Sequence, residues 1–453
     1  METLRSVFRV AVANFFSLGS SFIIGFILPV YISTYDYGKY KEFILYLSFV
    51  FIFNLGFNDG IYIKYGGRNK ESIDVVTLNS EVRFLKFFQG IIFSLIFLFA
   101  VYKHDSILIY FSLATLFTNL IQFHKNFLQA IGNFKLYSKL NIYNTIFNVL
   151  LMLIAIFVIS DGGYLIFIFS HVFALFLTYL FYEYNYYIEF KKGLREYIKL
   201  DHFEILNLFK IGIIILFSNM IVSFIASIGS WFVNFNFSTK DFAQYSFSTS
   251  LLNILLLIVN AISLVFFNLI AKNENEKMLI NLKKVLLLLG IFGGLGYFVF
   301  SFIIINFISK YTPALGILSI TFISIPYIMV SNVVFINLYK TRNNNKQYLI
   351  DMLLFLALAA SLITFASVFF TNMGYIALAT TFSYILWYFL VTNFKFRYLK
   401  DGNKERLLII SHILFFYMCV NILSFYHGLI VYIIYLLFIL CFYKNDLKNI
   451  MKF

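Results

Sequence analysis

The chain has 453 residues, of which 61% are hydrophobic and only 12% are charged, and its mean hydropathy is +0.86. Soluble domains carry roughly 25% charged residues, so these values exclude a soluble fold and indicate a polytopic membrane protein. The net charge of +14 comes from Lys and Arg spread over many short turns. It therefore predicts contacts with anionic lipid headgroups and no nucleic-acid partner.

Apolar runs that can cross roughly 30 Å of hydrocarbon predict about 14 transmembrane helices. In chain order, the predicted ranges are 7–31, 42–62, 82–102, 106–126, 139–160, 163–184, 207–234, 243–270, 284–307, 313–338, 348–370, 373–394, 407–426 and 428–443. The N-terminal METLRSVFRV lacks a small-residue cleavage site, so it is expected to lead into the first helix and not to form a removable signal.

The basic residues predict the orientation of these helices. Of the 35 Lys and Arg residues, the ones that fall at the odd-numbered turns are Lys39, Lys41, Lys103, Lys240 and Lys310. All others lie at the even-numbered turns and the termini. By the positive-inside rule, those turns and both termini are predicted to be cytoplasmic.

Short connections and missing motifs exclude several classes of membrane enzyme and pump. The outer turns have about ten residues or fewer, too few for an extracellular catalytic domain. The glycine cluster at Gly290–Gly296 lacks the lysine of a phosphate-binding loop, so ATP-driven transport by this chain is excluded. Gly290 and Gly294 instead predict close helix packing. Cys419 and Cys441 are expected to be buried packing residues, with no disulfide and no metal site.

An internal repeat predicts the architecture. STYDYGKY from Ser33 to Tyr40 matches STKDFAQY from Ser238 to Tyr245, and FRV at Phe8–Val10 matches FKI at Phe209–Ile211. Because the copies lie six helices apart, they predict two lobes of the same orientation. The predicted fold class is an all-α polytopic membrane protein with two pseudo-symmetric six-helix lobes around a central cleft plus two C-terminal helices.

The repeat also predicts domain boundaries. The N-terminal lobe is 1–185, a cytoplasmic interfacial linker is 186–206, the C-terminal lobe is 207–395, and helices 13 and 14 with the tail are 396–453. The linker contains YYIEFKKGLREYIKL, in which aromatic and basic residues alternate, and it is expected to lie on the inner leaflet. Pro326 is predicted to kink the tenth helix, because proline removes a backbone hydrogen bond.

Three features carry a resemblance to a known family: the duplicated lobes, the D-[YF]-[GA]-x-Y turn in both repeats, and LGFNDGIYIKYGG at the end of the second helix. In these features the chain resembles the polysaccharide transporter branch of the multidrug, oligosaccharidyl-lipid and polysaccharide exporter superfamily. It implies a flippase of undecaprenyl-diphosphate-linked oligosaccharide, such as an O-antigen unit, in the bacterial inner membrane. It also implies a polymerase and a chain-length regulator of the same pathway as partners. A monomer is expected, because a two-lobed transporter encloses its own pathway.

Charges within predicted spans are the candidate substrate-binding residues, because such charges are costly in a membrane. They are Arg9, Asp59, Lys64, Lys125 and Lys210. Four are cations, which suits a diphosphate, since charge-assisted hydrogen bonds to phosphate oxygens are strong. Each cation has the alternative of snorkelling to headgroups. Asp59 is expected to pair with Lys64 or Arg9, and Asn58 and Gly60 beside it to permit local unwinding of the helix.

Polar residues elsewhere in the spans are weaker candidates. His171, Asn14 and Asn58 are candidates for proton coupling or for a polar cavity, with ordinary helix packing as the alternative. No cofactor is expected, and H+ or Na+ is the candidate coupling ion. A cation-coupled multidrug exporter of the same superfamily remains an alternative function, and a glycan polymerase or glycosyltransferase is a further one. A multidrug exporter is expected to need buried carboxylates, and a polymerase or glycosyltransferase is expected to need a sizeable outer loop.

Overall fold

The computed structural model describes residues 22–443 except 69, 160–162, 192–200, 273 and 343–344, together with Phe16, Gly19 and Ser20. All regular elements in this described part are helical, so the predicted all-α membrane fold is confirmed. Within the described residues, ten helices are long and apolar enough to span a membrane, or up to 12 if each of two bent pairs is one span. The Phe22–Tyr31 helix is shorter, and α17 (Asn403–Asn421) has three charged residues in its first turn.

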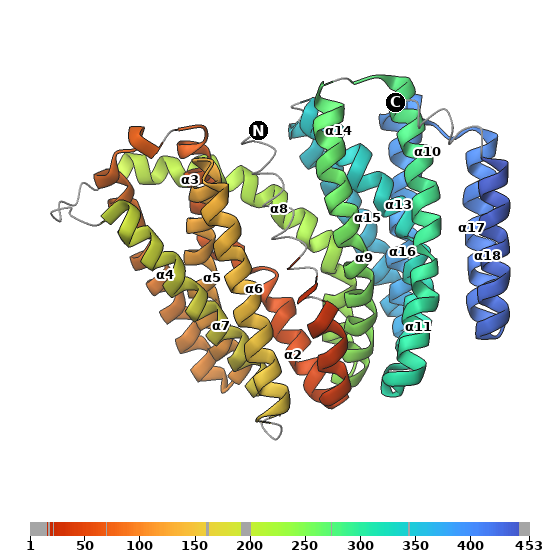
Figure 1. Cartoon of the computed structure of the whole chain (residues 1–453), viewed down its shortest axis with the longest axis horizontal. Coiled ribbons are helices and arrows are strands. Elements are labelled where there is room, and N and C mark those ends of the chain that lie inside the picture. Colours follow the sequence, from red (N-terminus) through yellow and green to blue (C-terminus); the bar gives the residue numbers. More distant parts are fainter. Residues whose placement is uncertain are drawn as a thin grey trace. The chain divides into compact units, whose positions relative to one another are not determined.

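The chain divides into two compact units, Met1–Phe224 and Ile225–Phe453. The division falls inside α8, so the predicted lobe and linker boundaries stay predictions. In the first unit, the helices α4 to α7 run side by side (Figure 1). Its elements are Phe22–Tyr31, α2 (Thr34–Leu47), η1 (Val50–Asn54), α3 (Phe57–Tyr65), η2 (Lys70–Ser72), α4 (Val75–Lys103), α5 (Ser106–Ala130), α6 (Phe134–Phe157), α7 (Gly163–Tyr186), η3 (Tyr187–Lys191) and the first part of α8 (His202–Asn236).

The second unit ends in an antiparallel hairpin formed by α17 and α18 (Figure 1). After the rest of α8, its elements are α9 (Thr239–Lys272), α10 (Glu276–Gly293), α11 (Leu295–Phe307), η4 (Ser309–Tyr311), α12 (Ala314–Phe322), α13 (Ile325–Val330), η5 (Ser331–Phe335), α14 (Ile336–Thr341), α15 (Asn345–Phe369), α16 (Met373–Leu390), η6 (Val391–Lys395), η7 (Arg397–Leu399), α17 and α18 (Phe425–Phe442). Cys419 is buried as expected, but Cys441 is exposed, because it lies off the buried stripe of α18.

The two copies of the sequence repeat have the same local structure. In the first, the Ser33 side chain caps α2 by accepting a hydrogen bond of 3.0 Å from the backbone N–H of Asp36. In the second, Ser238 accepts a bond of 3.2 Å from the backbone N–H of Asp241 at the start of α9. Both serine hydroxyls also donate to the aspartate carboxylates. The matched inner positions are buried in both copies, namely Tyr37 and Phe242, Gly38 and Ala243, and Tyr40 and Tyr245. These shared caps support an origin by duplication.

The predicted helix 42–62 is broken. The segments Thr34–Asn54 and Phe57–Tyr65 meet at an angle of 60°. Between them, Leu55 has φ 50° and Gly56 has φ 86°, and this left-handed backbone cannot continue a helix. The unwinding therefore lies at Leu55–Gly56, immediately before the positions that the sequence suggested.

Amide side chains from neighbouring helices satisfy the backbone around this break. Asn119 on α5 donates to the Val50 carbonyl at 3.3 Å, and Gln89 on α4 donates to the Phe53 carbonyl at 3.1 Å. Asn126 donates to the Asn58 carbonyl at 2.9 Å. Unsatisfied carbonyls cost several kcal/mol in lipid, so these amides allow a broken helix to exist at membrane depth.

The tenth predicted helix bends as expected from Pro326. Ala314–Phe322 and Ile325–Thr341 meet at 50°, with Pro326 in the first turn of the second segment. Gly290 on α10 lies against this turn, since an added Cβ there would be 2.3 Å from the Pro326 Cα. Gly294 faces the Tyr432 hydroxyl of α18. The predicted close packing at Gly290 and Gly294 is therefore confirmed.

A second glycine contact joins α3 to the first part of α8. A Cβ on Gly212 would lie 1.8 Å from the Gly56 carbonyl oxygen, and a Cβ on Gly60 would lie 2.2 Å from the Leu208 carbonyl oxygen. The two backbones are in direct contact, which only glycine permits.

Replacing Gly212 with alanine should therefore destabilise the purified protein by about 1–3 kcal/mol, because a methyl group would collide with rigid backbone. The measurement is the midpoint of thermal unfolding in detergent. Gly90→Ala on α4 is the matched control, since a Cβ there has nothing within 4 Å. Equal midpoints for the two variants would contradict the close contact.

Candidate functional site

Lys64, one of the predicted substrate cations, lies in a cluster of carboxylates. Its ammonium group is 2.6 Å from Glu81 on α4 and 3.2 Å from Glu204 at the start of α8. Glu81 is buried and also accepts a hydrogen bond of 2.8 Å from the Tyr65 hydroxyl. Two carboxylates therefore balance the charge of Lys64, which leaves little attraction for a phosphate.

Asp59 is half-buried on α3 and does not pair with Lys64. Within the described part of the chain it has no ion-pair or hydrogen-bond partner. Of the two predicted partners of Asp59, Lys64 is wrong, because Glu81 and Glu204 reach its ammonium group instead, and Arg9 lies outside the described residues, so that pair stays a prediction. A partly buried carboxylate without a partner is costly in a membrane span, so Asp59 remains a candidate for a role in transport.

Lys125 lies on a polar stripe of α5. Thr118, Gln122, Lys125 and Gln129 follow a spacing of four, three and four residues, which places them on one helix face. All four are partly exposed, although α5 as a whole is largely buried. Lys125 has no carboxylate partner among the described residues. The stripe can therefore present one uncompensated cation together with hydroxyl and amide groups.

The neighbouring α6 carries a second row of amides, Asn141, Asn144 and Asn148, each partly exposed. The side-chain oxygen of Asn144 accepts a hydrogen bond of 3.1 Å from the Thr178 hydroxyl on α7. Asn148 lies 3.5 Å from His171 Nδ1, and the His171 ring packs edge-on against Phe43. These contacts are those of a packed, hydrogen-bonded histidine, the alternative that the sequence left open.

Of the remaining predicted site residues, the structure describes Lys210 and Asn58 but not Arg9 and Asn14. Lys210 on α8 is exposed and has no ion-pair partner within the described segments. Asn58 is fully buried and donates a bond of 2.9 Å to the Asn119 carbonyl, so it belongs to the polar cluster at the helix break. Arg9 and Asn14 lie outside the described residues, as do Phe8–Val10 of the repeat.

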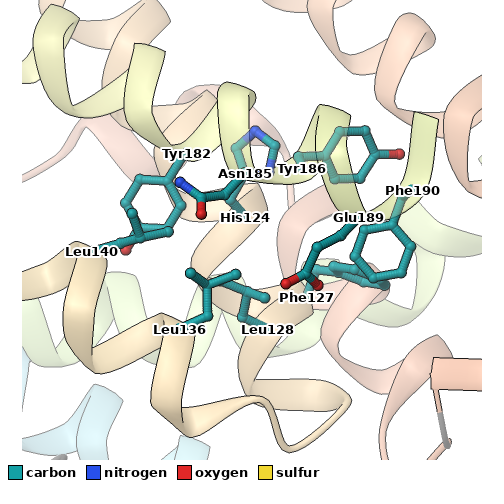
Figure 2. Close-up of a pocket in the computed structure, with 10 residues that line it drawn as sticks. All are labelled: His124, Phe127, Leu128, Leu136, Leu140, Tyr182, Asn185, Tyr186, Glu189 and Phe190. Atoms are coloured by element: carbon teal, nitrogen blue, oxygen red, sulfur yellow. The ribbon is translucent and has the colours of Figure 1, made fainter. Parts of the chain in front are cut away.

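A further charged group joins α4, α5 and α7. Glu183 binds the ammonium group of Lys86, and its other oxygen is 3.4 Å from His124 Nε2. Figure 2 shows His124 beside a small cavity, opposite Leu136 and Leu140 of α6 and near Asn185 and Glu189. The volume of this cavity is about 10 Å³, which is enough for one water molecule and far too small for a lipid-linked sugar.

An ion pair also joins η3, at the start of the predicted linker, to η2. Glu189 in η3 is 3.1 Å from Lys70 in η2, and the Lys70 ammonium group lies over the Phe190 ring at 5.1 Å. Most of the basic residues in the predicted interfacial segment lie in 192–200, outside the described residues. The predicted position of this segment on the inner leaflet stays a prediction.

Ion pairs in the second unit connect the ends of its helices. Lys283 on α10 is 2.6 Å from Asp401, and both side chains are almost fully buried. Asp351 on α15 is 2.7 Å from Lys395 in η6. Arg342, directly after α14, binds the carboxylate of Glu274, between α9 and α10, and this hydrogen bond raises the pKa of the guanidinium above its usual value. These contacts are within the unit, and we assign them to its stability.

Sequence reasoning missed Glu81, Gln89, Asn119 and Glu204. The carboxylates Glu81 and Glu204 lie just outside the predicted spans, where charged residues are common and do not indicate a functional site. Gln89 and Asn119 are mid-span amides, and many mid-span amides occur in this chain. One signal in the sequence pointed to these amides. Gly56 comes shortly before the polar segment Asn58–Gly60, and a glycine in that position is typical of a helix break, whose backbone needs hydrogen-bond donors from other helices.

The sequence matches the family model described as "Polysaccharide biosynthesis protein" over residues 3–274, more than half of the chain. Among solved structures, a lipid II flippase MurJ in an inward closed conformation has a similar fold. The TM-score is 0.73 at 14% identity, over 98% of this chain and 99% of that one.

An inward-facing multidrug resistance MATE family transporter of the MOP superfamily is also similar, with a TM-score of 0.56 at 12% identity. This match covers 88% of this chain and 99% of that one. At such identities the likeness establishes the fold alone. No protein with a curated description matches the sequence. The chain therefore belongs to the polysaccharide biosynthesis protein family, as a multi-pass membrane protein with the fold of MOP superfamily transporters.

Proposed function

We propose that this protein is a flippase that moves an undecaprenyl-diphosphate-linked oligosaccharide, an O-antigen or related repeat unit, from the cytoplasmic to the outer leaflet. The observation that carries the proposal is Lys125, a partly exposed cation on a membrane-spanning helix with no carboxylate partner among the described residues. The matched family and the fold of a lipid II flippase support the same substrate class.

The polar groups around Lys125 suit the two parts of such a headgroup. The ammonium group would donate charge-assisted hydrogen bonds to phosphate oxygens, which are strong where water is scarce. Gln122, Gln129 and Asn141 would bond sugar hydroxyls, as amides can both donate and accept. Arg9 and Lys210 are the additional cations that we propose for the diphosphate. Lys64 has a weaker case, because Glu81 and Glu204 already bind it.

Transport would follow alternating access, with the headgroup passing between the lobes and the tail remaining in lipid. We place the protein in the bacterial inner membrane with both termini in the cytoplasm, on the distribution of Lys and Arg. An inside-negative potential favours outward movement of an anion by about 2.3 kcal/mol per charge per 100 mV. A monomer, a coupling ion of H+ or Na+, and a polymerase and chain-length regulator as partners complete the proposal.

A leaflet-resolved analysis of glycolipids tests this function. In a host strain without the protein, complete undecaprenyl-diphosphate repeat units should accumulate on the cytoplasmic leaflet, and the surface glycan should be lost. Exported single units that do not polymerise would indicate a polymerase instead. Unchanged glycan with altered drug sensitivity would indicate the multidrug exporter.

A further inference from the structure

An apolar groove lies between the N-terminal helical segment and α6, both in the first unit. Its volume is about 430 Å³, within the range of small-molecule sites. Phe16, Gly19 and Ile23 line one side, and Ile146, Val149 and Leu150 line the other. Beyond the groove the two elements touch, since the rings of Tyr31 and Phe157 are 5.1 Å apart. The groove is therefore closed toward the end of the helices that is predicted to face outward.

Gly19 makes the groove open. A Cβ added to Gly19 would have nothing within 4 Å, so the space beside this residue is not filled by another part of the described chain. The wall opposite carries branched side chains, and Ile146 and Leu150 are themselves exposed. A branched hydrocarbon chain would contact this wall and fill the gap beside Gly19.

The same face of α6 becomes basic toward the inner end. Lys135, Lys139, Ile146 and Leu150 are spaced so that they fall within about 60° around the helix axis. Lys139 precedes Thr145, at the groove, by six residues, or about 9 Å along the helix. Both lysines are exposed and have no carboxylate partner among the described residues. The Lys139 ammonium group lies over the Tyr143 ring at 5.7 Å.

This order of groups, two cations followed by an apolar groove, is complementary to an anionic lipid that lies along α6. We propose that this is the place where the lipid first binds: the groove holds the first isoprene units of a polyprenyl diphosphate, and Lys135 and Lys139 hold the diphosphate before it moves on to Lys125. The inference rests on the proposed function and adds a place for the lipid tail.

The test compares variants that fill the groove with variants that do not. Wild-type protein, Gly19→Leu and Gly19→Ala are placed in nanodiscs, and binding of undecaprenyl diphosphate and of phosphatidylglycerol is measured by native mass spectrometry. Gly19→Leu should weaken binding of undecaprenyl diphosphate by about tenfold, because its side chain occupies the place of buried hydrocarbon. Gly19→Ala should stay within about twofold of wild type. Phosphatidylglycerol binding should be unchanged in both.

The basic end of the site is tested independently by Lys135→Gln with Lys139→Gln, which leaves the groove intact and should also weaken diphosphate binding. Normal binding by both Gly19→Leu and the lysine variant would overturn the groove proposal and leave the flippase proposal standing. Equal loss of phosphatidylglycerol would show an ordinary lipid groove, which also overturns it. A wild-type protein that binds no undecaprenyl diphosphate would refute the proposed function itself.

Discussion

Replacing Lys283 with methionine should lower the stability of the protein by about 3–5 kcal/mol, because it leaves a buried carboxylate without its cation. Lys283 is 1% exposed, and its ammonium group binds Asp401 and the Leu399 carbonyl, each at 2.6 Å. Asp401 would keep one hydrogen bond, from the Tyr388 hydroxyl at 2.7 Å. The measurement is thermal unfolding of the purified protein, with an expected shift on the order of 10 °C.

Two further variants distinguish a buried charge from a general loss of packing. The adjacent Lys284 pairs at 3.1 Å with Glu405, whose side chain is 9% exposed, but Lys284 itself is 23% exposed and water reaches this pair, so Lys284→Met should cost less than Lys283→Met, about 1–2 kcal/mol. Adding Asp401→Asn to Lys283→Met should recover part of the loss, since no charge then stays unpaired. Similar losses for Lys283→Met and Lys284→Met would mean that burial of the pair does not matter.

Lys125→Gln should reduce transport of the lipid-linked oligosaccharide by at least about tenfold while the protein remains folded. Glutamine keeps the length and polarity of the side chain but removes the charge that we propose for the diphosphate. Lys125→Arg, which keeps the charge, should retain a larger share of activity than glutamine. The readout is the initial rate of flipping in proteoliposomes, normalised to folded protein.

Lys103→Gln is the control for a change of net charge, because Lys103 is an exposed residue at the end of α4. It should transport at the wild-type rate. Wild-type rates in Lys125→Gln would remove Lys125 from the substrate site and, with it, the main observation behind the proposed function.

The positions of the helices were predictable from the sequence, because a membrane-spanning helix is determined by the hydropathy and length of its own segment. Each predicted range overlaps a helix of the described structure, and Pro326 gave the position of one bend because its cause lies in a single residue. The Ser33 and Ser238 motifs gave the repeat, because each cap is complete within four residues. Such features need no knowledge of what lies across the bundle.

The pairing of charges was not predictable, because it depends on which helices become neighbours. The sequence placed Asp59 beside Lys64, five residues along α3, whereas Glu81 and Glu204 reach Lys64 from α4 and α8. The break at Leu55–Gly56 was predicted a few residues too late, at Asn58–Gly60, for the same reason. Apolar composition favours a continuous span there, and the amides that stabilise the break, Gln89 and Asn119, come from later helices.

The broken helix has a consequence for biogenesis. During synthesis, Leu55 and Gly56 leave the ribosome well before Gln89, Asn119 and Asn126, whose amides satisfy the carbonyls around the break. Until α4 and α5 have been made, the Phe53 carbonyl lacks its donor from Gln89, and the Val50 and Asn58 carbonyls lack the additional donors that Asn119 and Asn126 supply, which is unfavourable in hydrocarbon. The segment therefore gains all of these donors only when α5 is present, so α2 to α5 should partition into the bilayer as a group and not one helix at a time.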